Sequence, residues 1–75
     1  MSGRLPTLRP REVVAALKRA GFVEHSQHGS NLVLRHPATM RRTVVPMHAR
    51  DLNRGLLKEI IKQAGVTEEE FRTLL

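Results

Sequence analysis

The chain contains no cysteine, tryptophan or tyrosine, and it has only two phenylalanines. The lack of cysteine excludes a disulfide framework, a thiolate nucleophile and every zinc finger that uses cysteine ligands. The scarcity of aromatic side chains argues against RRM or OB-type recognition, in which aromatic rings stack on unpaired bases. No apolar run approaches the ~18 residues of a membrane span, and there is no signal-peptide core. We therefore expect a cytoplasmic protein without membrane contact.

What the chain does have is positive charge. Thirteen Lys and Arg against seven Asp and Glu give a net charge of +6 over 75 residues, and ten of the thirteen are Arg. The planar guanidinium of Arg matches phosphate geometry better than the point charge of Lys does. The composition thus favours a nucleic-acid partner, although a small basic domain without one has the same balance. If RNA is that partner, backbone contacts and shape must carry the binding.

Hydrophobic periodicity predicts one helix followed by three strands. Residues 10–20 have apolar side chains at helical spacing, and Gly21 ends that helix in a left-handed cap. Strands are expected over residues 22–27, 31–36 and 41–45. The turns between them are too short for helical crossovers, so the strands should form an antiparallel meander.

The last third of the chain reads as helical. Asp51 or Asn53 can cap a helix that runs to Ala64, and Thr67 with Glu70 forms a capping box for a short final helix. We expect residues 1–9 to be a flexible leader and residues 10–75 to be a single domain. The fold class is α+β: an α-β-β-β-α arrangement with two helices on one face of a three-stranded antiparallel sheet, plus a short C-terminal helix. The opposite sheet face should be open to a partner.

Several short motifs occur together in this order. They are Gln27-His28-Gly29-Ser30-Asn31, Arg35-His36-Pro37, Val45-Pro46-Met47-His48 and the helical stretch 55–65, preceded by the stretch 14–22. Over roughly residues 9–72 the chain resembles the HicA-type toxin family. The resemblance implies a double-stranded-RNA-binding-like fold, a metal-independent endoribonuclease that cleaves mRNA without a cofactor, and a HicB-type antitoxin partner.

The sequence departs from that family at one decisive point. The family motif is Gly-Ser-His with a catalytic histidine, whereas here Gly29 and Ser30 are followed by Asn31. A histidine can move a proton near neutral pH, but an asparagine amide cannot titrate. Either this chain is a silenced toxin or a neighbour such as His28 acts instead. We favour silencing, because acid–base groups contribute typically 10²–10⁴-fold and are seldom relocated.

The candidate RNA-binding residues are Gly29, Ser30, Arg35, Arg41, Arg42, His48 and Lys58. Among them, Arg35, Arg41 and Arg42 cluster on the hairpin next to the Gly29-Ser30-Asn31 motif. Each also has an ordinary structural interpretation: a turn glycine, a turn hydroxyl, a loop histidine or a solvated helix face. We expect His36 to cap the hairpin turn and His25 to be an exposed strand residue. His25 and His28 lack further ligands, so no metal site is expected.

Three functions remain open from the sequence. The first is an endoribonuclease toxin, inactivated in this chain by Asn31. The alternative is a non-catalytic RNA-binding module of the same fold, whose affinity would fall with salt. The third is a protein that acts chiefly by binding an acidic antitoxin partner.

Overall fold

A computed structural model describes residues 7–75, which form three helices and three strands. The elements are α1 (Pro10–Arg19), β1 (Val23–His28), β2 (Asn31–Arg35), β3 (Arg42–Pro46), α2 (Arg54–Ala64) and α3 (Glu68–Thr73). The strands are antiparallel and lie in the order β1-β2-β3. The expected α+β, double-stranded-RNA-binding-like fold is confirmed, with element boundaries shifted by one residue at most of the predicted ends.

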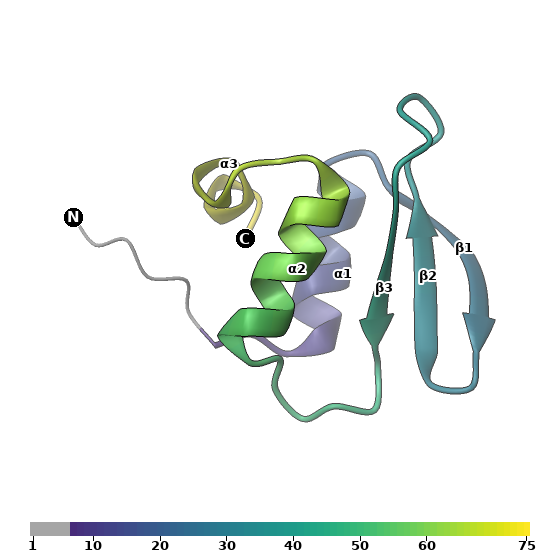
Figure 1. Cartoon of the computed structure of the whole chain (residues 1–75), viewed down its shortest axis with the longest axis vertical. Helices are drawn as coiled ribbons and strands as arrows, with labels where there is room; N and C mark the ends of the chain where they lie inside the picture. Colours follow the sequence, from purple (N-terminus) through teal and green to yellow (C-terminus); the bar gives the residue numbers. More distant parts are fainter. Residues whose placement is uncertain (1–6) are drawn as a thin grey trace.

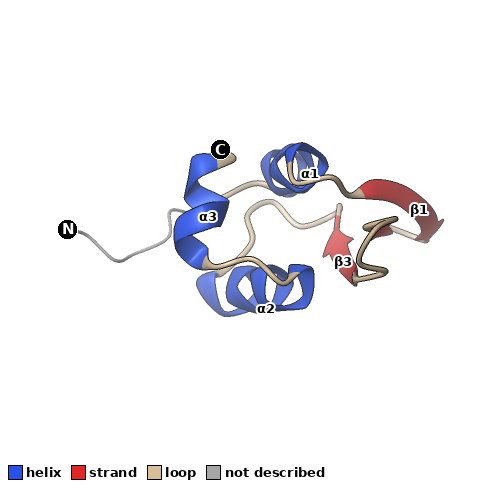
Figure 2. Cartoon of the chain, turned by 90° about the horizontal axis from the view of Figure 1, so that it is seen from above, coloured by secondary structure: helices blue, strands red, loops and turns tan. Residues whose placement is uncertain are grey.

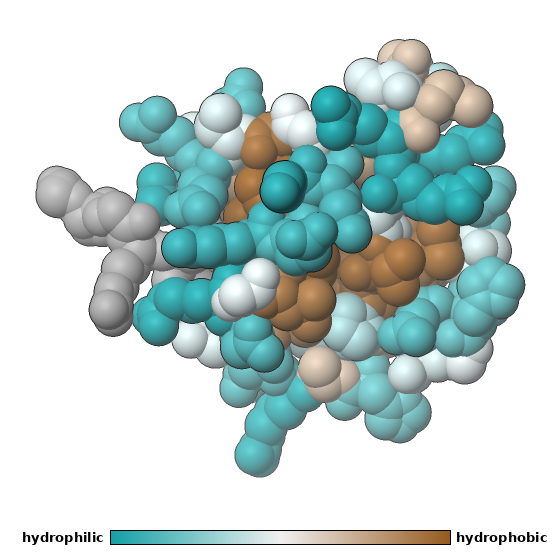
Figure 3. Space-filling view, viewed as in Figure 1, coloured by the Kyte–Doolittle hydropathy of each residue, from teal (hydrophilic) through white to brown (hydrophobic). Residues whose placement is uncertain are grey.

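The helices cover one face of the sheet. Figures 1 and 2 show α1 and α2 side by side on that face, with α3 lying across them on the side away from the strands. Leu32, Leu34 and Val45 point into this layer and are almost completely buried, as the strand alternation predicts. Phe71 of α3 is fully buried as well. On the side seen in Figure 3, hydrophobic surface gathers between α2 and the strands, and polar side chains surround it.

Local signals in the sequence account for the helix ends. Gly21 has φ +105°, and the amides of Gly21 and Phe22 donate to the carbonyls of Lys18 and Leu17, which is the Schellman pattern. Asn53, one of the two predicted caps, accepts a hydrogen bond from the Leu56 amide at 2.8 Å. These contacts satisfy helix-end groups that have no partner within the helix.

The predicted capping box of α3 is also present. The Glu70 amide donates to Thr67 Oγ1 at 3.0 Å, and the Thr67 amide donates to Glu70 Oε1 at 2.8 Å. Two otherwise unpaired donors are therefore satisfied reciprocally, which lets a helix of only six residues form.

His36 fastens the β2–β3 hairpin to the end of α1. Its Nδ1 accepts hydrogen bonds from the amides of Ala38 and Thr39 at 3.1 and 3.3 Å. Because Nδ1 is an acceptor, the ring proton lies on Nε2, which donates to the Ala20 carbonyl at 3.2 Å. The ring also meets Phe22 edge-on, with centroids 5.2 Å apart. The expected role of His36 in the hairpin turn is thus confirmed.

The first residues of the chain lie only partly within the structure. Of the leader expected over residues 1–9, the part up to residue 6 lies outside the described residues. Leu8 is buried, and its carbonyl accepts a hydrogen bond from the Leu52 amide at 2.8 Å. Within residues 7–75, no helix is long and apolar enough to cross a membrane.

Candidate functional site

The Gly29–Ser30 turn joins β1 and β2 at one end of the sheet (Figure 1). Gly29 has φ +62°, whereas Ser30 has a negative φ, which is the type II′ pattern with glycine at the first central position. A side chain on residue 29 would meet no atom within 4 Å, so the glycine is required for its backbone angle alone. This tight turn fixes the strand register on both sides of the motif.

The register places three rows of side chains on the open face of the sheet. From the turn outward, the rows are His28, Asn31 and Pro46; Ser26, Val33 and Val44; and Val23, Arg35 and Arg42. Val33 is only 9% exposed at the centre, while its row neighbour Val44 is 40% exposed. The open face therefore has an apolar centre between a polar end and a basic end.

Asn31 lies at the polar end of this face, on the middle strand, and is exposed. It is directly opposite His28 in the ladder, where facing Cβ atoms are about 5 Å apart. His28 Nε2 lies 3.3 Å from Ser26 Oγ. The structure thus places residue 31, where the family has its histidine, directly opposite His28, the neighbour that could act in its place.

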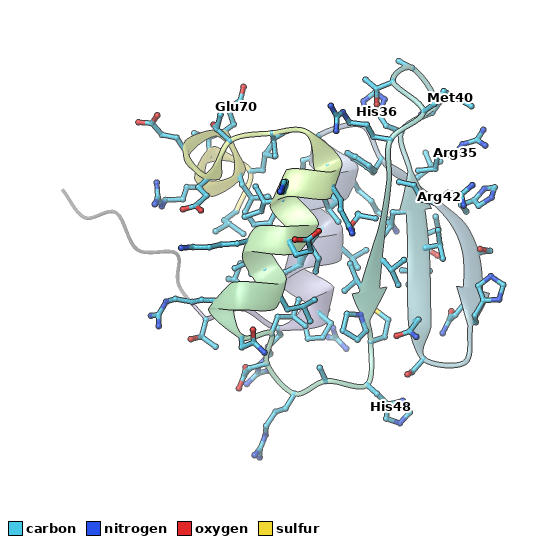
Figure 4. All side chains as sticks on the ribbon, in the orientation of Figure 1. Arg35, His36, Met40, Arg42, His48 and Glu70 are labelled. Carbon is cyan, nitrogen blue, oxygen red and sulfur yellow. The ribbon has the colours of Figure 1, made fainter. Side chains whose placement is uncertain are left out.

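A surface depression lies at the Gly29–Ser30 turn, between the turn and the β3–α2 loop. It is lined by Gln27, Gly29, Ser30, Met47 and His48. The Met47 amide donates to the Ser30 carbonyl at 2.7 Å, which holds the β3–α2 loop against the turn. His48 is exposed at this lower end of the molecule (Figure 4). The two motifs that are 17 residues apart in the chain therefore form one surface.

Arg35 and Arg42 form the basic end of the open face. They are paired in register across β2 and β3, and both point away from the helices (Figure 4). Like charges directly opposite each other are destabilising, yet neither guanidinium forms an ion pair with any of residues 7–75. Four residues separate Arg35 from Asn31, or about 13 Å along the strand. Arg35 and Arg42 can therefore bind an anion at some distance from the Gly29-Ser30-Asn31 motif.

Arg41 and Lys58, two other predicted RNA contacts, lie elsewhere. The Arg41 guanidinium donates to the Gln63 carbonyl and packs on Gly65 at the end of α2. The positive charge of Arg41 interacts favourably there with the negative end of the helix dipole. Lys58 is exposed on α2, and α2 packs on the face of the sheet opposite the open face (Figure 1). The structure does not bring these two side chains to the open face.

His25 occupies an irregular position in β1. The ladder with β2 shifts between Glu24 and Ser26, so His25 has no partner on β2, and its side chain is exposed. Such bulges are typical of edge strands, because they discourage pairing with another chain. Among residues 7–75, no three His, Asp or Glu side chains cluster in a way that would hold a metal ion.

The comparison with known families decides the identity. A family model described as the HicA toxin of bacterial toxin-antitoxin matches residues 10–66, about three quarters of the chain. The chain belongs to the HicA toxin family. That family is generally one of endoribonucleases, and membership implies an antitoxin partner. No curated protein matches this HicA-family chain.

Two features of this HicA-family site were not predicted from the sequence. Arg35, Arg41 and Arg42 were expected to form one cluster, whereas the Arg41 side chain turns toward α2. Arg9, Arg11 and Arg50 were not among the candidates, although they lie at the same end of the molecule as the motif. The available signal was the Arg-Pro-Arg sequence at the start of α1, which only the fold brings close to the β3–α2 loop.

Proposed function

We propose that this chain is a metal-independent endoribonuclease toxin that acts on mRNA, with its catalytic position occupied by Asn31 and its activity strongly reduced. The observation that carries the proposal is the placement of residue 31. It is exposed on the open face, opposite His28 and beside the Gly29–Ser30 turn, in a member of the HicA toxin family. A buried residue 31 would have excluded contact with RNA.

The chemistry assigned to this position is transfer of a phosphodiester within the RNA. A base takes the proton from a ribose 2′-hydroxyl, and the 2′-oxygen forms a bond to the adjacent phosphorus. The bond from phosphorus to the 5′-oxygen then breaks, and that oxygen receives a proton. The products are a 2′,3′-cyclic phosphate and a 5′-hydroxyl. A histidine can both accept and donate such a proton near neutral pH.

Asn31 retains much of what a histidine offers except titration. Its amide is similar in size and both donates and accepts hydrogen bonds, so it can hold an RNA oxygen. It cannot accept the 2′-hydroxyl proton. Loss of one general acid–base group lowers a rate by about 10²–10⁴-fold, which is the reduction we expect here.

Two regions would hold the RNA. The first is the depression at the turn that precedes residue 31, which is lined by Gly29, Ser30 and His48, and the second is the basic end of the open face. Arg35 and Arg42 supply two guanidinium groups without ion-pair partners in the described chain. Contacts of this kind go to phosphates, so they fix the position of the strand without reading its bases. Arg41 and Lys58 are not part of this proposed RNA site, because their side chains lie away from the open face.

A second candidate function is a non-catalytic RNA-binding module. Asn31 itself favours it, because the chain then keeps the binding face and lacks the proton-transfer group. On this alternative, RNA binds with a salt dependence set by the few phosphates neutralised. Restoring a histidine at residue 31 would then leave the RNA intact.

The partner that fits the open face is an antitoxin of HicB type. An acidic surface on it would complement Arg35 and Arg42, and its contact with the apolar centre at Val33 and Val44 would exclude RNA from the face. Both residues belong to the row between the basic end and Asn31.

Induction in cells that lack the antitoxin tests the proposal. We expect Asn31→His to arrest growth and degrade mRNA, and the starting chain to do neither. Asn31→Gln is the matched control, since it places a different side chain there without a titratable group. If the histidine variant accumulates to the same level and growth continues with intact mRNA, the enzyme proposal is wrong.

A further inference from the structure

A second depression lies next to the one at the Gly29–Ser30 turn. It is lined by Arg9, Pro10, Arg11, Met47, Ala49 and Arg50. Met47 lines both depressions, so they are neighbours on one edge of the molecule. Nothing in the proposed chemistry uses this second depression, which we call the arginine hollow.

Backbone hydrogen bonds join the segments that build this edge. The Met47 amide donates to the Ser30 carbonyl at 2.7 Å, and the Leu52 amide donates to the Leu8 carbonyl at 2.8 Å. The first bond ties the β3–α2 loop to the motif turn, and the second ties the same loop to the start of α1. The positions of the two depressions relative to each other are therefore set by the fold, which lowers the ordering cost of a ligand that spans both.

The arginine hollow has an excess of positive charge. Arg9, Arg11 and Arg50 are exposed, and none of them forms an ion pair with a described residue. The one carboxylate at the start of α1, that of Glu12, accepts a hydrogen bond from the Arg9 backbone amide at 2.9 Å. Three guanidinium groups around a hollow form a setting that suits phosphate, because each can donate two parallel hydrogen bonds.

We propose that the arginine hollow is a second phosphate-binding subsite, which holds the RNA strand where it leaves the position of residue 31. This inference rests on the proposed function, and it adds the path that the RNA strand takes over the surface. The RNA crosses Met47 and His48 into the hollow on one side, and it reaches Arg35 and Arg42 on the other. The scissile phosphate thus lies between two basic regions that grip the backbone.

Continuity with the motif favours RNA over an acidic protein as the occupant. Both depressions share a wall, and a single extended polyanion can fill them without any change in the chain. The sequence has few aromatic side chains for stacking on bases, so binding must come from phosphate contacts. Several such contacts along one path are what a strand without base stacking requires.

The test is RNA affinity as a function of salt. Fluorescence anisotropy measures binding of a labelled single-stranded RNA oligonucleotide to the full chain, to Arg11→Gln/Arg50→Gln and to Lys18→Gln/Lys62→Gln. The control pair removes the same charge at the C-terminal ends of α1 and α2, far from the hollow. Thermal melting of all three proteins checks that each is folded.

Removal of two phosphate contacts should lower the slope of log affinity against log salt by about 1.4, since each contact on a single strand contributes about 0.7. This change in slope corresponds to a loss of about 25-fold in affinity at 0.1 M salt. We expect the control pair to lose less than about threefold.

Equal losses in both variants, with the starting chain binding RNA, would overturn the subsite and leave the proposed function standing. Unchanged RNA binding in Arg11→Gln/Arg50→Gln would also overturn it, and would leave the hollow as a surface for an acidic protein. Failure of the starting chain to bind RNA at any salt would overturn the proposed function together with the subsite.

Discussion

Replacement of His36 by alanine should destabilise the chain more than any other histidine substitution. The change removes the two hydrogen bonds to the hairpin amides, the part-buried bond to the Ala20 carbonyl and the edge contact with Phe22. The two hairpin bonds are exposed and are each worth roughly 0.5 kcal/mol, the Ala20 bond about 1 kcal/mol, and the ring pair about 0.5–1 kcal/mol. The free energy of unfolding should fall by about 2–3 kcal/mol, and Tm by about 10–20 °C.

Thermal unfolding followed by circular dichroism measures this loss. His25→Ala is the matched control, because His25 is exposed at the bulge of β1, and its replacement should change stability by less than about 0.5 kcal/mol. Amide exchange gives an independent check, since the amides of Ala38 and Thr39 should exchange faster in His36→Ala alone. Equal Tm values for the two variants would refute the role assigned to His36.

Three further substitutions test the turns and caps by urea unfolding. Gly29→Ala should cost about 1–2 kcal/mol for the positive φ alone, and Gly21→Ala should cost more, because its Cβ would lie 2.6 Å from His36 Nε2. Equal costs at the two glycines would contradict the packing of His36 on Gly21. Thr67→Ala should cost about 1 kcal/mol, since the Glu70 amide loses its acceptor; a neutral result would mean that the capping box does not stabilise α3.

The fold was largely predictable, because its signals are local. The alternation of Leu32, Val33 and Leu34 specified which face meets the helices, and the predicted caps at Gly21 and Thr67 are those observed. The start of the first strand was predicted one residue too early. Phe22 looks like the first residue of a strand, but it completes the helix cap and packs against His36 before β1 begins.

Only some of the residues that form the candidate site could be predicted from the sequence. The pairing of His28 with Asn31 follows from a two-residue turn, so the sequence contained it. The position of the Arg41 side chain could not be predicted from the sequence. Whether it lies on the open face or against α2 depends on the space that Gly65 leaves. Likewise, Arg9 and Arg50 are far apart in the chain and meet only through the pairing of Leu8 with Leu52.

Product analysis of a cleaved RNA tests the central claim most directly. Purified Asn31→His protein is incubated with an end-labelled RNA in excess EDTA, beside the starting chain and Asn31→Gln. The account predicts cleavage by the histidine variant alone, at least about 10²-fold faster than the other two, with 2′,3′-cyclic phosphate and 5′-hydroxyl ends. Intact RNA with the folded histidine variant, or products bearing 5′-phosphates, would contradict it.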